Sequence, residues 1–412
     1  MSHFHQRLQL LKRPAFLSYM IGFFCAAFGN GMGYIAMSWI VVTRHSNVTA
    51  MAILMACFWG PNVILGPFMG VLADRLSRKG MMLISNFVRA VIFIIFSIYL
   101  RNHFNVNTVY IMMLCIGVSF SAFFSCVFAF MRELVPEKDL MHANSTIDII
   151  YEAGNMIGMG LAGLLIAWTS EQTAILINGI AFLIATASLF FIPQKALLHG
   201  GKRETKKIKL FQDFQDGLTY LFANKKLIVL SVVQLLIFMT FLTTPLLLVP
   251  FSKTVLHATV GQFGMIEAFA SIGIVIGGIF MPWISEQFGF WRVLLFFSFV
   301  LCVIFMVFGY NHLIPIAAFL YFAIGFSGAI WPLIITKAQA ITAIDFQGRV
   351  QSTFNSVSGT MMLIFYFTIG WIGNHFAVKH LYWLEVIISL LAICFLIYAK
   401  KNDASQKRVS TM

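Results

Sequence analysis

Three acidic side chains stand inside long apolar stretches of the chain. Asp148 and Glu152 lie four residues apart in the segment IDIIYEAGNMIGMG, and Glu267 lies in GMIEAFASIGIVIGG. If the first segment is a helix, this spacing puts Asp148 and Glu152 on the same helix face. A carboxyl group held away from water can take up a proton on one side of a membrane and release it on the other. The chemistry that these residues offer is therefore reversible proton binding.

The composition places these acids in a membrane protein. Of the 412 residues, 60% are hydrophobic and only 10% are charged, whereas soluble globular proteins are about 45–50% apolar and about 25% charged. Such a chain cannot cover a water-facing surface, which excludes a soluble enzyme and a nucleic-acid-binding domain despite the net charge of +13. The 44 phenylalanines exclude a disordered chain. We therefore expect an integral membrane protein made of many helices.

Twelve stretches are long and apolar enough to cross a bilayer, which takes about 20 helical residues. The first is too long for the core of a signal peptide, and we interpret it as a retained helix. Continuous apolar runs exclude a β-barrel, whose short strands alternate between apolar and polar residues. The expected spans are 15–42, 50–73, 80–100, 107–131, 141–168, 172–193, 227–251, 260–285, 291–310, 313–336, 348–374 and 380–399.

Lysine and arginine indicate the orientation. With both termini in the cytoplasm, 23 of the 28 basic residues fall in cytoplasmic segments and four fall outside. This distribution follows the positive-inside rule, and it explains the net charge as a signal for topology and lipid headgroups. Nucleic acid is therefore not an expected partner.

A basic polar segment, 194–226, divides the chain into two halves of six expected spans each, 1–193 and 227–412. Its second part, LFQDFQDGLTYLF, carries its apolar residues on one helical stripe. Such a stripe is typical of a short helix that lies at the membrane surface. Six spans on either side of a basic loop predict two pseudo-symmetric helical bundles with a path between them.

The loop after the second span carries a sequence motif. It reads GVLADRLSRK and resembles the signature of the major facilitator superfamily of transporters, whose residues here are Gly70, Asp74, Arg75, Arg78 and Lys79. The resemblance implies the major facilitator fold, an all-α integral membrane fold of twelve transmembrane helices in two six-helix bundles. It also implies that the motif forms a cytoplasmic lock that opens during transport.

The corresponding loop of the second half reads PWISEQ. It keeps an acid, Glu286, but neither the glycine nor the Asp-Arg pair. Two further basic residues, Arg132 in RELVPE and Arg349 in QGRV, are expected at the same cytoplasmic gate.

The segments around Arg132 and Arg349, together with FGN ending at Asn30, resemble the macrolide-efflux-like branch of drug:proton antiporters. The likeness covers essentially the whole chain and implies efflux in exchange for protons across a bacterial inner membrane. One departure concerns Asn30, which is neutral where that branch often has an acid. Proton coupling is therefore not carried over to this position.

The buried acids have a coupling and a structural interpretation. In the superfamily fold spans five and eight face each other, so Glu152 and Glu267 are expected to converge near the midplane. An intramembrane acid costs about 2.5–3.5 kcal/mol on insertion scales, which makes proton coupling or substrate contact the first hypothesis. Alternatively, Asp148 can pair with Arg89 of the third span, and Glu267 can hydrogen-bond across helices. Glu385, in the last span, is expected to be structural or interfacial.

The two halves do not repeat these acids. Alignment of span five with span eleven places Asp148 over Asn355 and Glu152 over Gly359. Glycine-rich runs, 154–163 in span five and 273–278 in span eight, permit close approach of neighbouring helices.

The resemblance implies that spans one, four, seven and ten line the substrate path. Aromatic side chains with few fixed polar groups suit bulky amphipathic molecules, although most rings in so aromatic a chain must pack between helices or face lipid. Asn30 and Gln234 are stronger candidates, because buried amides need partners. The expected cavity residues are Phe23, Asn30, Tyr34, Arg89, Gln234, Phe238 and Trp331.

Other chemistries lack their motifs. No Walker phosphate loop, nucleophile elbow or zinc-protease helix occurs, so neither ATP-driven transport nor an enzyme is expected. No two histidines share a buried helix face, and no metal or other cofactor is expected. The prediction is a monomeric, proton-coupled exporter of a small-molecule substrate in contact with membrane lipids. Export of a specific metabolite such as a siderophore, lysophospholipid transport, and a non-transporting sensor remain as alternatives.

Overall fold

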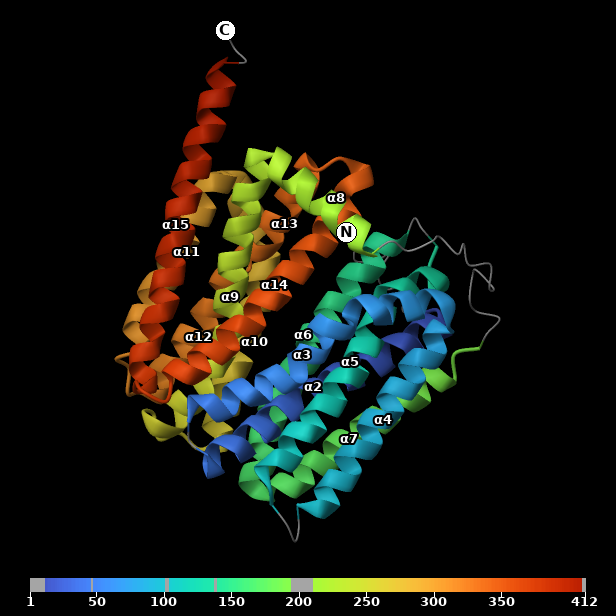
Figure 1. Ribbon diagram of the computed structural model, residues 1–412. Coiled ribbons are helices and arrows are strands. Elements are labelled where there is room, and N and C mark those ends of the chain that lie inside the picture. Colours follow the sequence, from blue (N-terminus) through green and yellow to red (C-terminus); the bar gives the residue numbers. More distant parts are fainter. Residues whose placement is uncertain (1–11, 46, 101–103, 137–138, 194–209, 410–412) are drawn as a thin grey trace. The chain divides into compact units, whose positions relative to one another are not determined.

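The computed structural model describes residues 12–45, 47–100, 104–136, 139–193 and 210–409, and helices are the regular elements of these segments (Figure 1). The first half contains α2 (Pro14–Arg44), α3 (Val48–Arg75), α4 (Arg78–Tyr99), α5 (Val106–Leu134), α6 (Leu140–Trp168) and α7 (Glu171–Phe190). The remainder contains α8 (Leu210–Ala223), α9 (Lys225–Thr254), α10 (Val260–Phe288), α11 (Phe290–Phe308), α12 (Ile314–Gly328), α13 (Ile330–Ile341), α14 (Ile344–Ile372) and α15 (Val378–Val409).

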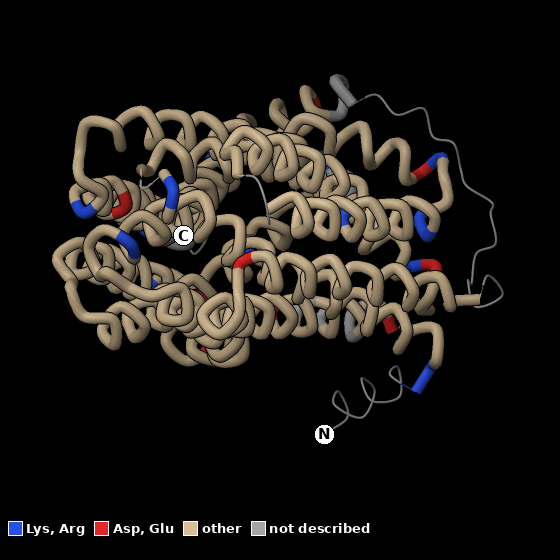
Figure 2. Tube along the Cα trace, turned by 90° about the horizontal axis from the view of Figure 1, so that it is seen from below, with Lys and Arg blue, Asp and Glu red and all other residues tan. Residues whose placement is uncertain are grey.

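The expected all-helical membrane architecture is confirmed. Within the described segments, eleven helices are long and apolar enough to cross a membrane, with Ile314–Ile341 counted as one. Of the helices at expected spans, the one outside this set is α14, which has 29 residues and coincides with the expected span 348–374. Its first half is rich in Gln, Ser, Thr and Asn, and several of these side chains bond within the helix, as Ser356 donates to the Ser352 carbonyl and Gln351 to Asn355 Oδ1. Figure 2 shows the resulting pattern, long uncharged stretches of helix with few charged residues.

The expected tenth span, 313–336, is broken in the structure. α12 ends at Gly328, and Ala329 donates its backbone N–H to Phe326 and Ser327 before α13 begins. The second piece also continues to Ile341, beyond the expected end. Hydropathy did not predict this interruption, because the residues on both sides of it are apolar.

The described residues form two compact units. Unit 1 is the described part of Met1–Arg44, Leu54–Ile208 and Thr259–Ala268, and unit 2 is that of His45–Ile53, Lys209–Ala258 and Phe269–Met412. Unit 1 therefore contains the first turns of α10 in addition to α2 and α4 to α7. Unit 2 contains the first turns of α3.

Glycines set the packing of α2 against α6 in unit 1. A Cβ atom added at Gly158 of α6 would overlap the backbone carbonyl of Phe28, and one at Gly31 of α2 would overlap that of Asn155. The two backbones are thus in direct contact along this seam. Gly154 extends it, because a Cβ atom there would lie 2.8 Å from that of Ala27. The expected close approach through the 154–163 run is found.

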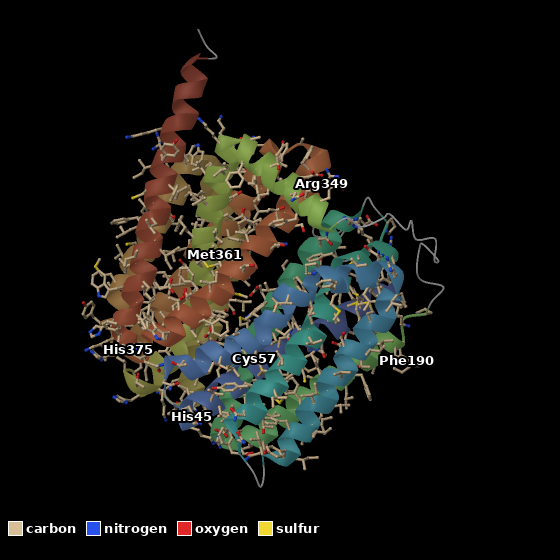
Figure 3. The ribbon with its side chains drawn as sticks, in the orientation of Figure 1. His45, Cys57, Phe190, Arg349, Met361 and His375 are labelled. Atoms are coloured by element: carbon tan, nitrogen blue, oxygen red, sulfur yellow. The ribbon has the colours of Figure 1, made fainter. Side chains whose placement is uncertain are left out.

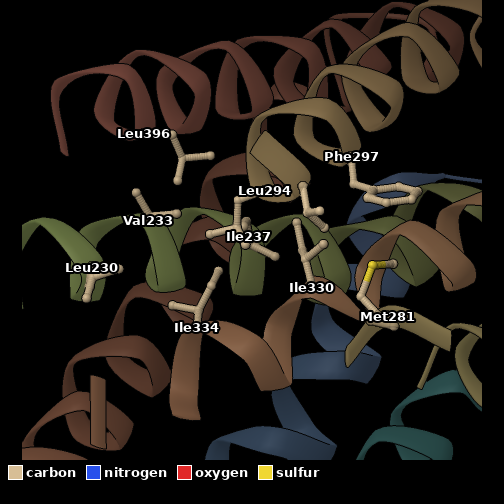
Figure 4. Packing of buried hydrophobic residues seen from close by; sticks show 11 residues of the cluster. Leu230, Val233, Ile237, Met281, Leu294, Phe297, Ile330, Ile334 and Leu396 are labelled. Atoms are coloured by element: carbon tan, nitrogen blue, oxygen red, sulfur yellow. The ribbon is translucent and has the colours of Figure 1, made fainter. Parts of the chain in front are cut away.

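Unit 2 contains a core of aliphatic side chains around α9. Leu230, Val233 and Ile237 extend from one face of α9 toward α11, α13 and α15 (Figure 4). The side chains that meet them are Met281, Leu294, Phe297, Ile330, Ile334 and Leu396. This face of α9 is consequently covered by side chains from α10, α11, α13 and α15.

The helix expected in the second part of the basic segment is present as α8. One part of its apolar stripe is buried and another part is exposed. Leu221 is buried with Leu227 and Val350, and the ring of Tyr220 stacks on that of Phe346 with 4.4 Å between centroids. Phe222, in contrast, is 68% exposed. Part of the stripe therefore packs on α9 and α14, and the location of α8 at the membrane surface stays a prediction.

We predict that Gly158→Ala lowers the thermal unfolding midpoint of the purified protein. The added methyl group meets the Phe28 carbonyl, and overpacking of this kind costs about 1–3 kcal/mol. Gly278→Ala is the matched control, because a Cβ atom there meets nothing within 4 Å. Equal unfolding midpoints for the two variants would contradict the close contact between α2 and α6 at Gly158.

Candidate functional site

Glu267 is a buried carboxyl that accepts a hydrogen bond from one residue of another helix. Its side chain on α10 is 6% exposed, and the Tyr34 hydroxyl of α2 donates to Glu267 Oε1 at 2.7 Å. Phe263, one turn earlier on α10, packs against the rings of Tyr34 and Trp39. All of these residues belong to unit 1. An ionisable group is thus held in an apolar, aromatic environment by one hydroxyl.

The first turns of α10 reach Tyr34 because they pack closely on α6. A Cβ atom at Gly264 would lie 2.8 Å from the Met159 carbonyl, and one at Gly163 would lie 2.8 Å from that of Val260. Position 160 faces Ala268. Residue numbers fall on α6 as they rise on α10, so the helices run antiparallel and Glu267 lies near the level of residues 156–160.

Glu152 lies on α6 within two turns of that level and is half-buried. Its expected convergence with Glu267 stays a prediction. The side chain of Asp148 lies outside the described residues, although its backbone is part of α6.

Arg89 of α4 is fully buried in unit 1, and its described partners are neutral. Its guanidinium donates to Asn86 Oδ1 at 2.5 Å, to Asn30 Oδ1 at 3.3 Å and, through Nε, to the Ser85 carbonyl at 3.3 Å. It also lies over the rings of Phe123 and Phe182, at 4.7 and 4.5 Å from their centroids.

Amide oxygens and ring faces stabilise the Arg89 cation but do not neutralise its charge. Among the described side chains no carboxylate forms a salt bridge with Arg89. The pairing with Asp148 stays a hypothesis, since that side chain is not described. The amides Asn30 and Asn86 are partners of Arg89 that the sequence argument did not assign to it.

The expected cavity residues of unit 1 are packed rather than open. Phe23 is buried, and its ring lies 6.2 Å from that of Phe123 and 6.0 Å from that of Tyr151. Asn30 and Tyr34 are engaged with Arg89 and Glu267. α2 therefore presents its polar side chains to partners on two other helices.

In unit 2 one of the expected residues, Gln234, lines a small polar recess. Gln234 of α9 is buried, and no described residue bonds its Nε2. It borders a cavity of about 20 Å³ that Gln339, Gln347 and Gln351 also line. The ring of Phe238 stacks on Trp331 at 5.1 Å between centroids. A buried amide next to stacked rings suits contact with an amphipathic molecule.

The signature motif forms an ion-pair network within unit 1. Arg78 pairs with Asp74 at 3.0 Å and with Glu133 of α5 at 2.8 Å. Lys79 Nζ donates to the carbonyl of Phe190, the last residue of α7, at 3.1 Å and to that of Ile192, beyond the helix, at 2.6 Å. The motif thus ties α3, α4, α5 and α7 together at one end of the unit.

The other expected gate residues are not part of this ion-pair network. Arg75, Arg132 and Glu286 are exposed, and Gly70 has open space around it. Arg349, labelled in Figure 3, pairs with Asp216 of α8 at 3.3 Å within unit 2. Their common role in a cytoplasmic gate stays a prediction.

The sequence argument missed Glu133 as the partner of Arg78, and Asn86 and Phe182 as partners of Arg89. One signal was available for Asn86, which precedes Arg89 by three residues on the same helix face. No local signal points to Glu133 or Phe182, because they come from other helices. Among the described residues no group of three or more His, Cys, Asp and Glu side chains is arranged to hold a metal ion.

Comparisons with known proteins extend this description. The family model of the Major Facilitator Superfamily matches residues 19–253 and residues 230–411. The uncharacterized MFS-type transporter YfiS of Bacillus subtilis (strain 168) is 30% identical over 177 residues, 43% of this chain and 42% of that protein. The multidrug efflux pump Tap of Mycolicibacterium fortuitum is 26% identical over 163 residues, 38% of this chain and 40% of Tap. The same identity over 163 residues links the chain to the putative bacilysin exporter BacE of Bacillus amyloliquefaciens, covering 39% of this chain and 40% of BacE.

These matches span less than half the length of each relative, whereas the likeness to solved structures extends over nearly the whole chain. The nucleoside transporter NupG has a TM-score of 0.75 at 14% identity and covers 94% of this chain and 99% of its own. A bacterial homologue of the human lysosomal transporter Spinster has a TM-score of 0.68 at 11% identity and covers 94% and 96%. At these identities the likeness concerns the fold.

We predict that Arg89→Lys lowers stability by about 1–3 kcal/mol, because one ammonium group cannot reach both amides and the Ser85 carbonyl while lying between two rings. The measurement is the thermal unfolding midpoint in detergent. Arg292→Lys, at an exposed position of α11, is the control. A midpoint equal to that of the control would contradict the described environment of Arg89.

Proposed function

Because the chain belongs to the major facilitator superfamily, we propose that it is a proton-coupled exporter of small amphipathic organic molecules. Transport proceeds by alternating access, in which residues 1–193 and 227–412 rock against each other in the inner membrane with both termini in the cytoplasm. The observation that carries the proposal is the Glu267 carboxyl, buried on α10 and bonded to Tyr34.

The Tyr34–Glu267 bond can respond to a proton. An ionised carboxylate accepts from the tyrosine hydroxyl and forms a charge-assisted bond, whereas a protonated carboxyl retains a weaker one. Proton binding therefore changes the free energy of the contact between α2 and the first turns of α10. These turns also pack closely on α6 through Gly163 and Gly264. The carboxyl therefore lies next to a helix contact that must open if α10 moves away from α6.

The choice of substrate class rests on two supports. One is the recess beside Gln234 with the stacked pair Phe238 and Trp331, because aromatic and amide groups adapt to bulky amphipathic molecules. The other is the likeness to Tap and BacE, which are named as an efflux pump and a putative exporter. Export rather than import follows from that likeness.

A second candidate is export of a specific metabolite that carries an anionic group. It is favoured by Arg89, whose charge is surrounded by amides and rings in the described structure. Under this alternative Arg89→Gln abolishes transport of anionic molecules. Under the main proposal the same variant retains transport of an amphipathic cation such as ethidium.

We predict that Glu267→Gln uncouples transport from the proton gradient. The Gln side chain still accepts a hydrogen bond from Tyr34 but cannot ionise. We therefore expect ethidium counterflow across the proteoliposome membrane to persist, whereas ethidium efflux driven by a pH gradient falls at least tenfold. Flux is measured with and without an imposed pH gradient. Tyr34→Phe tests the other partner and is expected to weaken coupling without abolishing it.

The matched control is Glu171→Gln, which alters a carboxylate paired with Arg44. Gradient-driven flux that is undiminished in the Glu152→Gln, Glu267→Gln double variant would disprove the assignment of coupling to these acids. Wild-type flux that ignores the pH gradient would disprove proton coupling itself.

A further inference from the structure

Glu385 of α15 is a buried carboxyl that the proposed mechanism does not use. Its side chain is 1% exposed. Oε1 bonds with the hydroxyl of Thr243 on α9, and Oε2 has no hydrogen-bond partner among the described residues. No described lysine, arginine or histidine forms a salt bridge with it. The group therefore lies in an apolar interior with half of its hydrogen-bonding capacity unused.

The contact between Glu385 and Thr243 lies in a turn of α9 that side chains from two further helices also contact. The Tyr366 hydroxyl donates to the Leu242 carbonyl at 3.3 Å, and the Tyr321 hydroxyl donates to the Thr244 carbonyl at 3.2 Å. Glu385 contacts the residue between them. The next residue is Pro245, which cannot donate a helical hydrogen bond and so weakens the helix at this point. α12, α14 and α15 thus all brace one turn of α9.

The equivalent place in unit 1 shows that the fold does not require an acid there. Asn178 is the eighth residue of α7, as Glu385 is of α15, when each helix is counted from its first residue. Asn178 is fully buried against α2, where Cβ atoms at Gly29 and Gly33 would each lie 2.8 Å from its amide. An amide fills this position in one half. A carboxyl in the other half costs more free energy to bury in a membrane than an amide does, which indicates a functional role for Glu385.

The bonding of Thr243 links the charge of Glu385 to α9. Its Oγ1 lies 2.8 Å from the Met239 carbonyl as well as next to Glu385, yet a hydroxyl has only one hydrogen to donate. If Glu385 is protonated, its O–H donates to Thr243, which then donates to Met239. If Glu385 is ionised, Thr243 must donate to the carboxylate, and the Met239 carbonyl loses that bond. Two protonation states thus require two arrangements of this turn.

We propose that Glu385 is a second proton-binding site, and that loading and unloading of its proton switches the Thr243 hydroxyl between the Met239 carbonyl and the carboxylate. The proton goes to and from water, and no other bond is made or broken. The titratable groups that lie at this turn are Tyr321 and Tyr366, which bond the neighbouring carbonyls. Near Glu385 itself are Tyr382, three residues earlier on α15, and Cys302 of α11, whose Sγ lies 4.0 Å from the Val386 carbonyl. This inference rests on the proposed proton coupling, and it places one coupling carboxyl in unit 2 in addition to Glu267 in unit 1.

The first experiment uses the proton itself as the probe. Infrared spectra of the purified full-length protein are recorded across a pH series, and the carboxylic acid C=O band absent in Glu385→Gln is assigned to this residue. Gln mimics the protonated acid, since its NH₂ group donates to Thr243. We expect the band to disappear as pH rises and to shift in Thr243→Val. A band that is present at every pH would identify a permanently protonated structural group and overturn the proposal.

Sodium and protein stability provide the controls. Loss of the band on addition of NaCl at fixed pH, but not of choline chloride, would overturn the proton as the ligand in favour of Na⁺. Glu171→Gln should leave the band unchanged. If Glu385→Gln does not fold, the band is assigned instead as the carboxylic acid band that Thr243→Val shifts. Spectra in which Thr243→Val shifts no band contradict the link to α9.

Transport separates this inference from the proposed function. In proteoliposomes we expect Glu385→Gln to keep ethidium counterflow and to lose at least tenfold in flux driven by a pH gradient. Full gradient dependence in this variant, with Glu267→Gln uncoupled, overturns the role of Glu385 alone. Absence of gradient dependence in the wild type overturns proton coupling, whatever the infrared titration shows.

Discussion

No water solvates a polar group in the hydrocarbon interior of a membrane, so each such group must find its partner within the protein. Threonine and serine do so inside their own helix, as Thr186 donates to the Phe182 carbonyl and Ser358 to that of Phe354. Longer polar side chains reach other helices instead. The pairs Tyr34–Glu267, Arg89–Asn30 and Thr243–Glu385 join α2 to α10, α4 to α2 and α9 to α15. Polar contacts of this kind select which helices of an otherwise uniform apolar set lie together.

The helices themselves could be predicted because hydropathy is a local property. An apolar run of sufficient length becomes a helix wherever its neighbours are, and the expected spans agree with the observed helices to within a few residues at most ends. The exceptions are not local. α12 and α13 are separated at Ala329 within an apolar run. Similarly, the stripe of α8 indicated a helix but not that Leu221 packs on Val350.

The partners of the polar residues could be predicted only in part. Spacing along one helix shows which residues share a face, as for Asn86 and Arg89, but it cannot show which helix comes to that face. Tyr34 and Glu267 are 233 residues apart, and Thr243 and Glu385 are 142 apart. The sequence argument therefore sought the nearest opposite charge for Arg89, whereas its described partners are amides and rings. Opposite charge is one way to stabilise a buried cation, and oriented amide oxygens with ring faces are another.

The two hydroxyl–carboxyl bonds show how function is added to a repeated scaffold. In each unit the first long helix, α2 or α9, presents a hydroxyl to a buried carboxyl, but the carboxyl comes from α10 in one case and α15 in the other. The two acids therefore do not lie on corresponding helices of the two halves. Asn178 and Glu385 illustrate the same point at a position that does correspond. The scaffold fixes where a polar group fits, and the residue chosen decides whether that group can carry a proton. If the two carboxyls bind protons as proposed, they do so at unlike sites in two halves of one repeated fold.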